Sequence, residues 1–156
     1  MATLFVRKTL VIHALTSKVW DVLTKPEYTS KWITQFSPKI VLLESTWKKG
    51  SPVLWKEKNG HVNVQGTVTA VKPHSLLRFT VGPADSKVDV TYSEDDGIMY
   101  TLEGRKGYTH LSITQGDFAK VPEHAKYADL TSRVWDHVLP IVQQLAEEYD
   151  RSRAKI

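Results

Sequence analysis

The sequence predicts an α+β domain in which a curved antiparallel sheet of about seven strands wraps around one long C-terminal helix. Two observations predict this fold class. Short alternating segments separated by turn residues run from residue 38 to 116, which is typical of an antiparallel meander. Residues 123–150 then carry one broad apolar stripe at helical spacing. Because a sheet curled around a single helix can enclose space, we expect function in an interior cavity.

Length and composition agree with one domain over residues 1–156. A hydrophobic fraction of 41% with five tryptophans is typical of a folded chain. The absence of cysteine excludes disulfides and thiolate chemistry. The net charge of +4 comes from scattered residues, so we expect no nucleic-acid partner. Charges at Arg7 and Lys8 interrupt the apolar N-terminal stretch, and no run reaches the roughly 18 residues of a membrane span, so we expect a cytoplasmic protein.

The first elements are a strand and two short helices. Residues 3–13 are rich in β-branched and aromatic residues and predict a strand. Thr16 or Ser17 can cap a short helix that continues to about Leu23. Pro26 then begins a second short helix, because proline is tolerated in a first helical turn.

The Asn59-Gly60 dipeptide predicts a two-residue hairpin turn between two strands. In that register Glu57 faces Val62, Trp55 faces Val64 and Val53 faces Gly66. One face of the hairpin then holds Val53, Trp55, Val62 and Val64, with Glu57 near its end. The agreement of two independent alternations on one register supports this pairing.

The other strands follow from alternation and turn residues. Gly66 lies inside a strand that continues to Val71 and predicts a bulge or bend there. The segment 83–97 is ambiguous, since VDVTY alternates but both flanks are polar. The remaining predicted strands are residues 39–45, 52–58, 76–81, 98–104 and 108–115.

The final helix follows Pro122 and has Glu123 in its first turn. Pro140 removes one backbone donor and predicts a kink. The apolar positions at helical spacing are Tyr127, Leu130, Val134, Val138, Ile141, Val142, Leu145 and Tyr149.

Several sequence pieces occur in the order of a known family. They are Val19 to Thr24, Pro26-Glu27, Trp32, Gly66 to Val68, Pro73 with Leu76-Leu77, Tyr100 to Glu103, Leu111 to Phe118 and Trp135. With these pieces the chain resembles the START-like (SRPBCC) superfamily. Within that superfamily it resembles the family named after the C-terminal domain of the activator of the ninety-kilodalton heat-shock chaperone's ATPase. The resemblance implies the helix-grip fold. Relatives bind lipids, plant hormones, polyketides or drugs, and some are cyclases, so the fold alone does not fix a function.

No motif for metal, cofactor or nucleophilic catalysis occurs. The six histidines lack the i, i+4 spacing of a helical zinc site, and there is no GxSxG, so we assign no catalytic residue, metal or cofactor. Three titratable residues could still be polar groups of a cavity: Glu57, Glu103 and His110. A carboxyl group inside an apolar pocket can act as an acid. An outward side chain or a rim salt bridge is the alternative for each.

The leading hypothesis is a protein that binds a hydrophobic or aromatic small molecule, lipid- or polyketide-like, between sheet and helix. Trp32 and Phe36 would lie at the mouth of this cavity, although ordinary core packing also accounts for such aromatic residues. The expected lining residues are Val53, Trp55, Val64, Phe79, Tyr100, Leu111, Tyr127, Leu130, Val134 and Val138.

Two other functions stay open. One is a cyclase- or hydrolase-like enzyme that uses Glu57, Glu103 or His110. The other is a chaperone ATPase cofactor; we do not expect a chaperone partner, since full-length activators of that kind carry a separate N-terminal domain. Exposed edge strands would also permit a homodimer.

Overall fold

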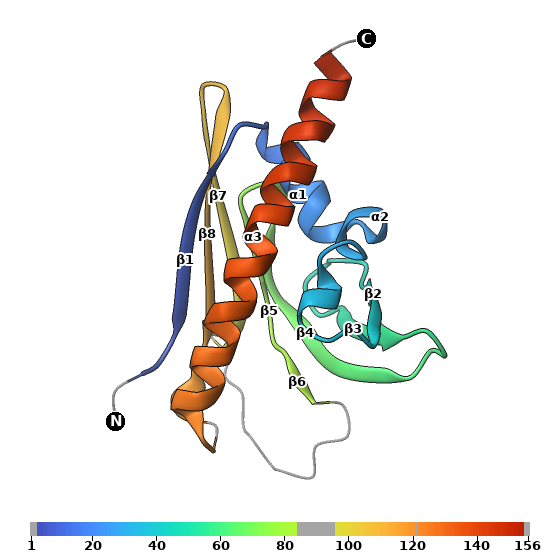
Figure 1. The fold of residues 1–156 in the computed structure, drawn as a ribbon, viewed down its shortest axis with the longest axis vertical. Helices are drawn as coiled ribbons and strands as arrows, with labels where there is room; N and C mark the ends of the chain where they lie inside the picture. Colours follow the sequence, from blue (N-terminus) through green and yellow to red (C-terminus); the bar gives the residue numbers. More distant parts are fainter. Residues whose placement is uncertain (1–2, 84–95, 121, 155–156) are drawn as a thin grey trace.

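The computed structural model describes residues 3–83, 96–120 and 122–154. A curved sheet wraps around one long helix, as predicted (Figure 1). The ambiguous segment 83–97 lies mostly outside the described residues. In chain order the elements are β1 (Val6–Ile12), α1 (Thr16–Thr24), α2 (Pro26–Thr29), the 3-10 helix η1 (Ile33–Gln35), β2 (Ile40–Glu44), β3 (Pro52–Glu57), β4 (Val62–Lys72), β5 (Leu76–Phe79), β6 (Gly82–Pro83), β7 (Gly97–Arg105), β8 (Tyr108–Gly116), the 3-10 helix η2 (Phe118–Lys120) and α3 (His124–Ala154).

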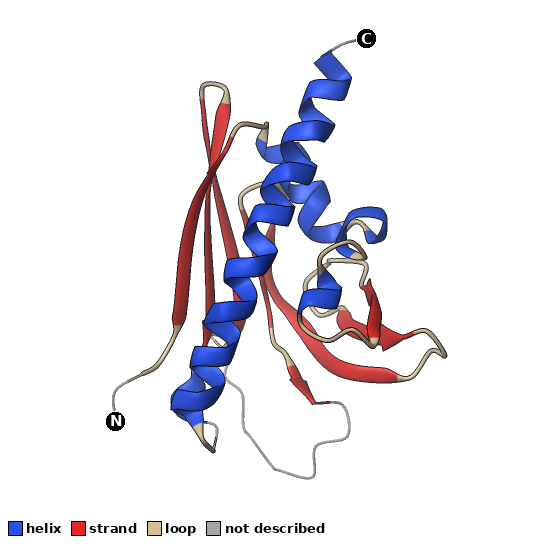
Figure 2. Ribbon diagram, viewed as in Figure 1, coloured by secondary structure: helices blue, strands red, loops and turns tan. Residues whose placement is uncertain are grey.

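The sheet has the strand order β1-β8-β7-β5-β4-β3-β2, and the two-residue β6 adds to β4. All of these pairings are antiparallel. The strand at the N-terminus therefore lies beside the last strand, and the 11-residue β4 joins the two halves of the sheet. Helix α3 crosses the concave side (Figure 2). No described helix combines the length and the apolar composition that crossing a membrane requires.

The β3–β4 hairpin keeps the predicted register except beside its turn. Trp55 pairs with Val64 and Val53 with Gly66, as predicted. The turn itself is different, since the Glu57 N–H donates to the His61 carbonyl at 2.9 Å and Lys56 pairs with Val62. The loop thus has three residues, 58–60, and Gly60 takes the positive φ of 87° that this loop type requires. Asn63 is an extra residue on β4 that forms a bulge, and this bulge restores the predicted register from Val64 onward.

Of the predicted bulge or bend at Gly66, the structure has no bulge there; the glycine allows a close approach of two backbones. The β3–β4 pairing runs through Gly66 without interruption, and the register shift on the β5 side falls between Val68 and Ala70. A Cβ atom at Gly66 would lie 1.6 Å from the Thr80 carbonyl oxygen. Glycine is therefore required where β4 bends from one half of the sheet to the other.

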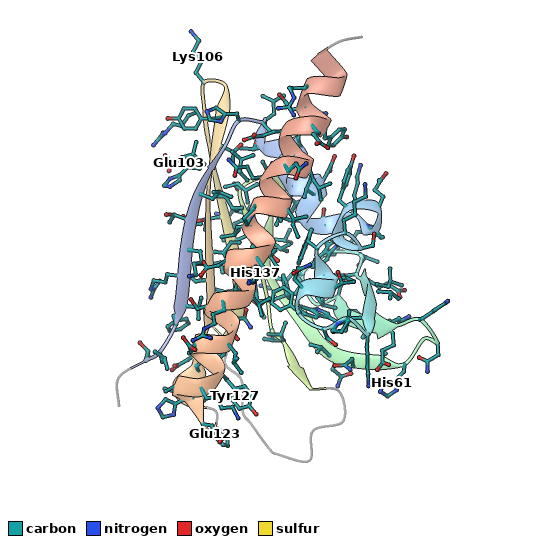
Figure 3. All side chains as sticks on the ribbon, in the orientation of Figure 1. His61, Glu103, Lys106, Glu123, Tyr127 and His137 are labelled. Carbon is teal, nitrogen blue, oxygen red and sulfur yellow. The ribbon has the colours of Figure 1, made fainter. Side chains whose placement is uncertain are left out.

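Helix α3 buries a face that only partly matches the predicted stripe. Its buried side chains are Ala128, Trp135, Val138, Leu139, Val142 and Ala146. Tyr127 and Leu130 are instead 43% and 46% exposed. Figure 3 shows Tyr127 at the N-terminal end of α3, far from Lys106 at the tip of the β7–β8 hairpin. The helix continues through Pro140, and the kink there stays a prediction.

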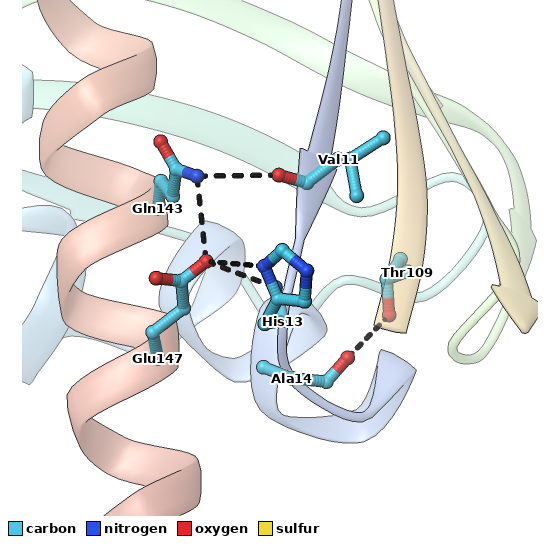
Figure 4. Close-up of polar contacts among 6 residues, drawn as sticks. All are labelled: Val11, His13, Ala14, Thr109, Gln143 and Glu147. Carbon is cyan, nitrogen blue, oxygen red and sulfur yellow. Dashed lines mark hydrogen bonds and ion pairs between the residues drawn. The ribbon is translucent and has the colours of Figure 1, made fainter. Parts of the chain in front are cut away.

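The C-terminal half of α3 caps the open end of β1 (Figure 4). Gln143 Nε2 donates to the Val11 carbonyl at 3.2 Å, and the His13 N–H donates to Glu147 Oε2 at 2.9 Å. These bonds satisfy backbone groups that an uncovered sheet edge would expose. They fix the helix against the sheet at one end of the molecule.

The cap of α1 also comes from α3. We predicted Thr16 or Ser17 at this position, but the N-cap is Leu15, whose side chain makes no capping bond. The Leu15 N–H donates to Asp150 Oδ1 at 3.3 Å. Tertiary contact thus replaces the local side-chain cap that the sequence suggested.

Candidate functional site

A cluster of aromatic rings fills the middle of the space between the sheet and α3. Trp135 is fully buried at its centre and its ring lies 5.1 Å from Phe36, 6.1 Å from Tyr100 and 6.3 Å from Trp32, measured between ring centroids. Phe36 in turn lies 5.3 Å from Trp55. Sequence reasoning left Trp135 out of the lining residues, although an indole amid a helical stripe is a strong signal for the core.

Trp135 also joins α3 to the last strand by a hydrogen bond. Its Nε1 donates to Gln115 Oε1 at 2.8 Å. Gln115 lies on the inner face of β8, two residues beyond the buried Ile113. An indole N–H can only donate, so the oxygen of the Gln115 amide must face it. The two N–H donors of this amide make no bond within the described part of the chain.

Trp32 and Phe36 do not play the same part. Trp32 is 1% exposed, and its Nε1 donates to the Val22 carbonyl at 2.9 Å, so it belongs to the core and not to a mouth as we expected. Phe36 is half-buried and follows the short helix η1. Phe36 is therefore the aromatic residue at the margin of this cluster.

One indole within the cluster lacks a hydrogen-bond partner. Trp55 is 5% exposed, and its Nε1 has no acceptor among the described residues. The Thr29 hydroxyl is the other such buried group there. An unpaired buried donor costs about 1–3 kcal/mol, so each of these groups requires an explanation.

The predicted lining residues occupy three environments. Six are buried in the core: Val53, Trp55, Phe79, Tyr100, Leu111 and Val138. Val64 and Val134 are half-buried and pack against that core. Tyr127 and Leu130 are exposed. Tyr127, Leu130 and Val134 together form an apolar surface on the N-terminal half of α3, called here the α3 strip.

The three candidate polar residues separate to different faces. Glu57 shares the Trp55 face of β3, is partly buried, and accepts a bond from Asn63 Nδ2 at 3.3 Å. Glu103 and His110 pair with each other across β7 and β8, on the face opposite to Tyr100 and Leu111. Neither can contact a ligand between sheet and helix, which leaves Glu57 as the one remaining candidate of the three.

Burial of Tyr100 gives the protein a pH dependence at alkaline pH. Desolvation raises the pKa of Tyr100 well above the ordinary value of 10.0. Above pH 10 the unfolded chain therefore releases a proton that the folded protein retains, and stability falls as pH rises. We expect Tyr100→Phe to lessen this fall, which urea unfolding between pH 9 and 11 would measure. An identical slope for the variant and the wild type would contradict it.

An open groove of about 420 Å³ lies at the bend of β4. It includes Leu54, Gln65 and Thr67, which alternate with Val53 and Trp55 and therefore lie on the outer face. This groove is on the other side of the sheet from the aromatic cluster. Among the described residues, no group of three histidine or carboxylate side chains gathers as a metal site would require.

Comparisons with known proteins agree with this architecture. The family model described as "Activator of Hsp90 ATPase homolog 1-like protein" matches residues 13–147. No curated protein matches the sequence. Among solved structures, protein MLL2253 from Mesorhizobium loti is 20% identical with a TM-score of 0.73, covering 94% of this chain and 99% of its own. The Aha1 dimer from Colwellia psychrerythraea is 16% identical with a TM-score of 0.68, covering 92% of this chain and 96% of its own. At these identities the likeness shows the fold alone.

Proposed function

Because the chain belongs to the family of Activator of Hsp90 ATPase homolog 1-like proteins, we propose that it binds a hydrophobic or aromatic small molecule between the curved sheet and the N-terminal half of α3. The observation that carries this proposal is the α3 strip. Tyr127 and Leu130 are exposed although they continue the apolar side of a helix whose C-terminal half is packed on the core. Since Leu130 is 46% exposed, burying the rest of its side chain would contribute about 1 kcal/mol.

Half-buried apolar residues that pack against the core from the sheet side support an apolar ligand. Val64 comes from β4, Val81 from the segment between β5 and β6, and Phe36 from the segment after η1. Apolar walls with few polar groups are typical of small-molecule sites. The packed aromatic cluster limits how deeply a ligand can enter unless one of its rings moves.

Native mass spectrometry of the protein purified from its own source tests the proposal directly. We expect the native protein to be heavier than its sequence mass by the mass of a small organic molecule. Treatment with organic solvent should remove this extra mass. Protein that carries no such mass, and that binds no member of a panel of apolar and aromatic compounds, would contradict the proposal.

Replacing Leu130 with lysine should weaken ligand binding without unfolding the protein. A charge placed in the α3 strip would have to be desolvated against the ligand, so we expect affinity to fall about tenfold or more. Thermal stability should change little, because Leu130 is 46% exposed. Isothermal titration with a compound from the panel measures the affinity. Val41→Lys, at an exposed apolar position on β2, is the matched control and should bind normally.

Self-association is a separate proposal. Among the described strands β1 pairs with β8 alone, so within the described part of the chain its other edge is open where α3 does not cap it. The dimer described for the Colwellia psychrerythraea protein belongs to that protein. Sedimentation equilibrium would test this chain, and a single monomer mass across concentrations would reject the proposal.

A further inference from the structure

Trp55 and Gln115 place unused hydrogen-bond donors at the two ends of one row of aromatic rings. The row runs from Trp55 on β3 through Phe36 and Trp135 to Gln115 on β8. Trp55 Nε1 is buried without an acceptor within the described chain. The Gln115 amide must turn its oxygen to Trp135, which leaves its two N–H donors for another partner.

We propose that the ligand carries an uncharged oxygen acceptor, such as a ketone or quinone carbonyl, that receives a hydrogen bond from Trp55 Nε1. The Gln115 amide, at the opposite end of the row, is a donor for a second acceptor on a longer ligand. This inference rests on the proposed function and names the chemical class of its ligand. A bound molecule that supplies an acceptor would satisfy the buried Trp55 donor.

The charges around Trp55 favour a neutral oxygen over a carboxylate. Glu57 lies on the same face of β3, two residues along the strand, and would repel an anion. Leu43 and Val64, which pair with Trp55 on the neighbouring strands, are aliphatic. Lys8 is a cation on the inner face of β1, but its Nζ already forms an ion pair with Asp136 Oδ1 at 2.9 Å. A carbonyl oxygen is the acceptor that this environment accommodates without an unpaired charge.

Phe36 controls access to this donor. Its ring meets the Trp55 ring at 5.3 Å and 73°, and it is half-buried at the margin of the cluster. Trp32 and Trp135 are held by hydrogen bonds to Val22 and Gln115, whereas a phenyl ring has no such restraint. A ligand therefore reaches Trp55 when Phe36 changes rotamer.

Two probes with the same carbon frame test the inference: benzophenone, which has a carbonyl, and diphenylmethane, which lacks it. The full chain is labelled with ¹⁵N, and Trp55→Phe identifies the Trp55 signal among its five indole N–H resonances. We expect benzophenone to move that resonance downfield and to bind about tenfold more tightly than diphenylmethane.

Two variants separate the Trp55 donor from general packing. Trp55→Phe removes the donor and should bring the two affinities closer together. Trp20→Phe, which changes an indole outside the aromatic row, should leave their ratio unchanged. Thermal melts confirm that each variant is folded.

The outcomes distinguish this inference from the proposed function. Equal affinity for both probes, or an unmoved Trp55 resonance, overturns the inference and leaves apolar binding intact. Binding of neither probe to the wild type overturns the inference together with the function on which it rests.

Discussion

Replacing Trp135 with alanine is expected to lower the free energy of unfolding by about 3–5 kcal/mol. Trp135 is fully buried, and its ring contacts Trp32, Phe36 and Tyr100. The substitution would leave a cavity at the centre of the cluster and would deprive Gln115 of its donor. Since a domain is stabilised by only about 5–15 kcal/mol, this loss is a large share of the total. Urea unfolding followed by circular dichroism measures it.

Tyr127→Ala provides the matched control, because it removes another aromatic ring from the same helix. Tyr127 is 43% exposed, so we expect a loss of no more than about 0.5 kcal/mol. A loss for Trp135→Ala as small as the one expected for Tyr127→Ala would mean that the aromatic cluster does not support the fold. A Trp135→Ala protein with nearly normal stability would contradict the prediction outright.

The fold could be predicted from the sequence because alternation assigns each strand residue to one face. Tyr100 and Leu111 were expected inside, and both are buried. The same alternation also argues against two of our polar candidates. Glu103 is three residues after Tyr100 and His110 is adjacent to Leu111, so each falls on the opposite face. That signal was present in the sequence and could have removed both from the site.

Other features depended on contacts that a linear pattern does not contain. The Asn59-Gly60 pair suits both a two-residue and a three-residue loop, and only the fit of the strands selects the longer one. The apolar spacing of α3 predicts a stripe, but it does not reveal where the sheet stops covering the helix. Leu130 is therefore exposed although it fits the pattern of the buried Val138.

The site is harder to predict than the fold because it is defined by hydrogen-bond donors that lack a partner in the protein. The sequence marks Trp55 as an inward aromatic residue, and its burial confirms that position. Whether its N–H finds an acceptor depends on side chains from β2, β4 and the segment after η1. A lining role and a core role look alike in the sequence, since both require apolar residues on the same face.

The bend of β4 leads to the second large expected effect: Gly66→Ala should lower the free energy of unfolding by about 3 kcal/mol or more. The new Cβ atom would lie 1.6 Å from the Thr80 carbonyl oxygen. The backbone there cannot yield easily, because Thr80 N donates to the Thr67 carbonyl and Thr67 N donates to Thr80 Oγ1, both at 2.9 Å. The strands must separate, and the curl that surrounds α3 would be lost with them.

Gly104→Ala is the control for this substitution, since it also adds a methyl group to a strand glycine. Among the described residues its Cβ would approach only the Thr16 methyl group, at 3.2 Å, so we expect a change below about 1 kcal/mol. Thermal unfolding of both variants, with ligand binding measured on any folded Gly66→Ala protein, completes the test. A Gly66→Ala protein as stable as the wild type would show that the contact with Thr80 does not set the curvature. If that variant folds but no longer binds apolar compounds, the bend of β4 shapes the site as well as the sheet, because Val64 lies on β4 two residues before the bend.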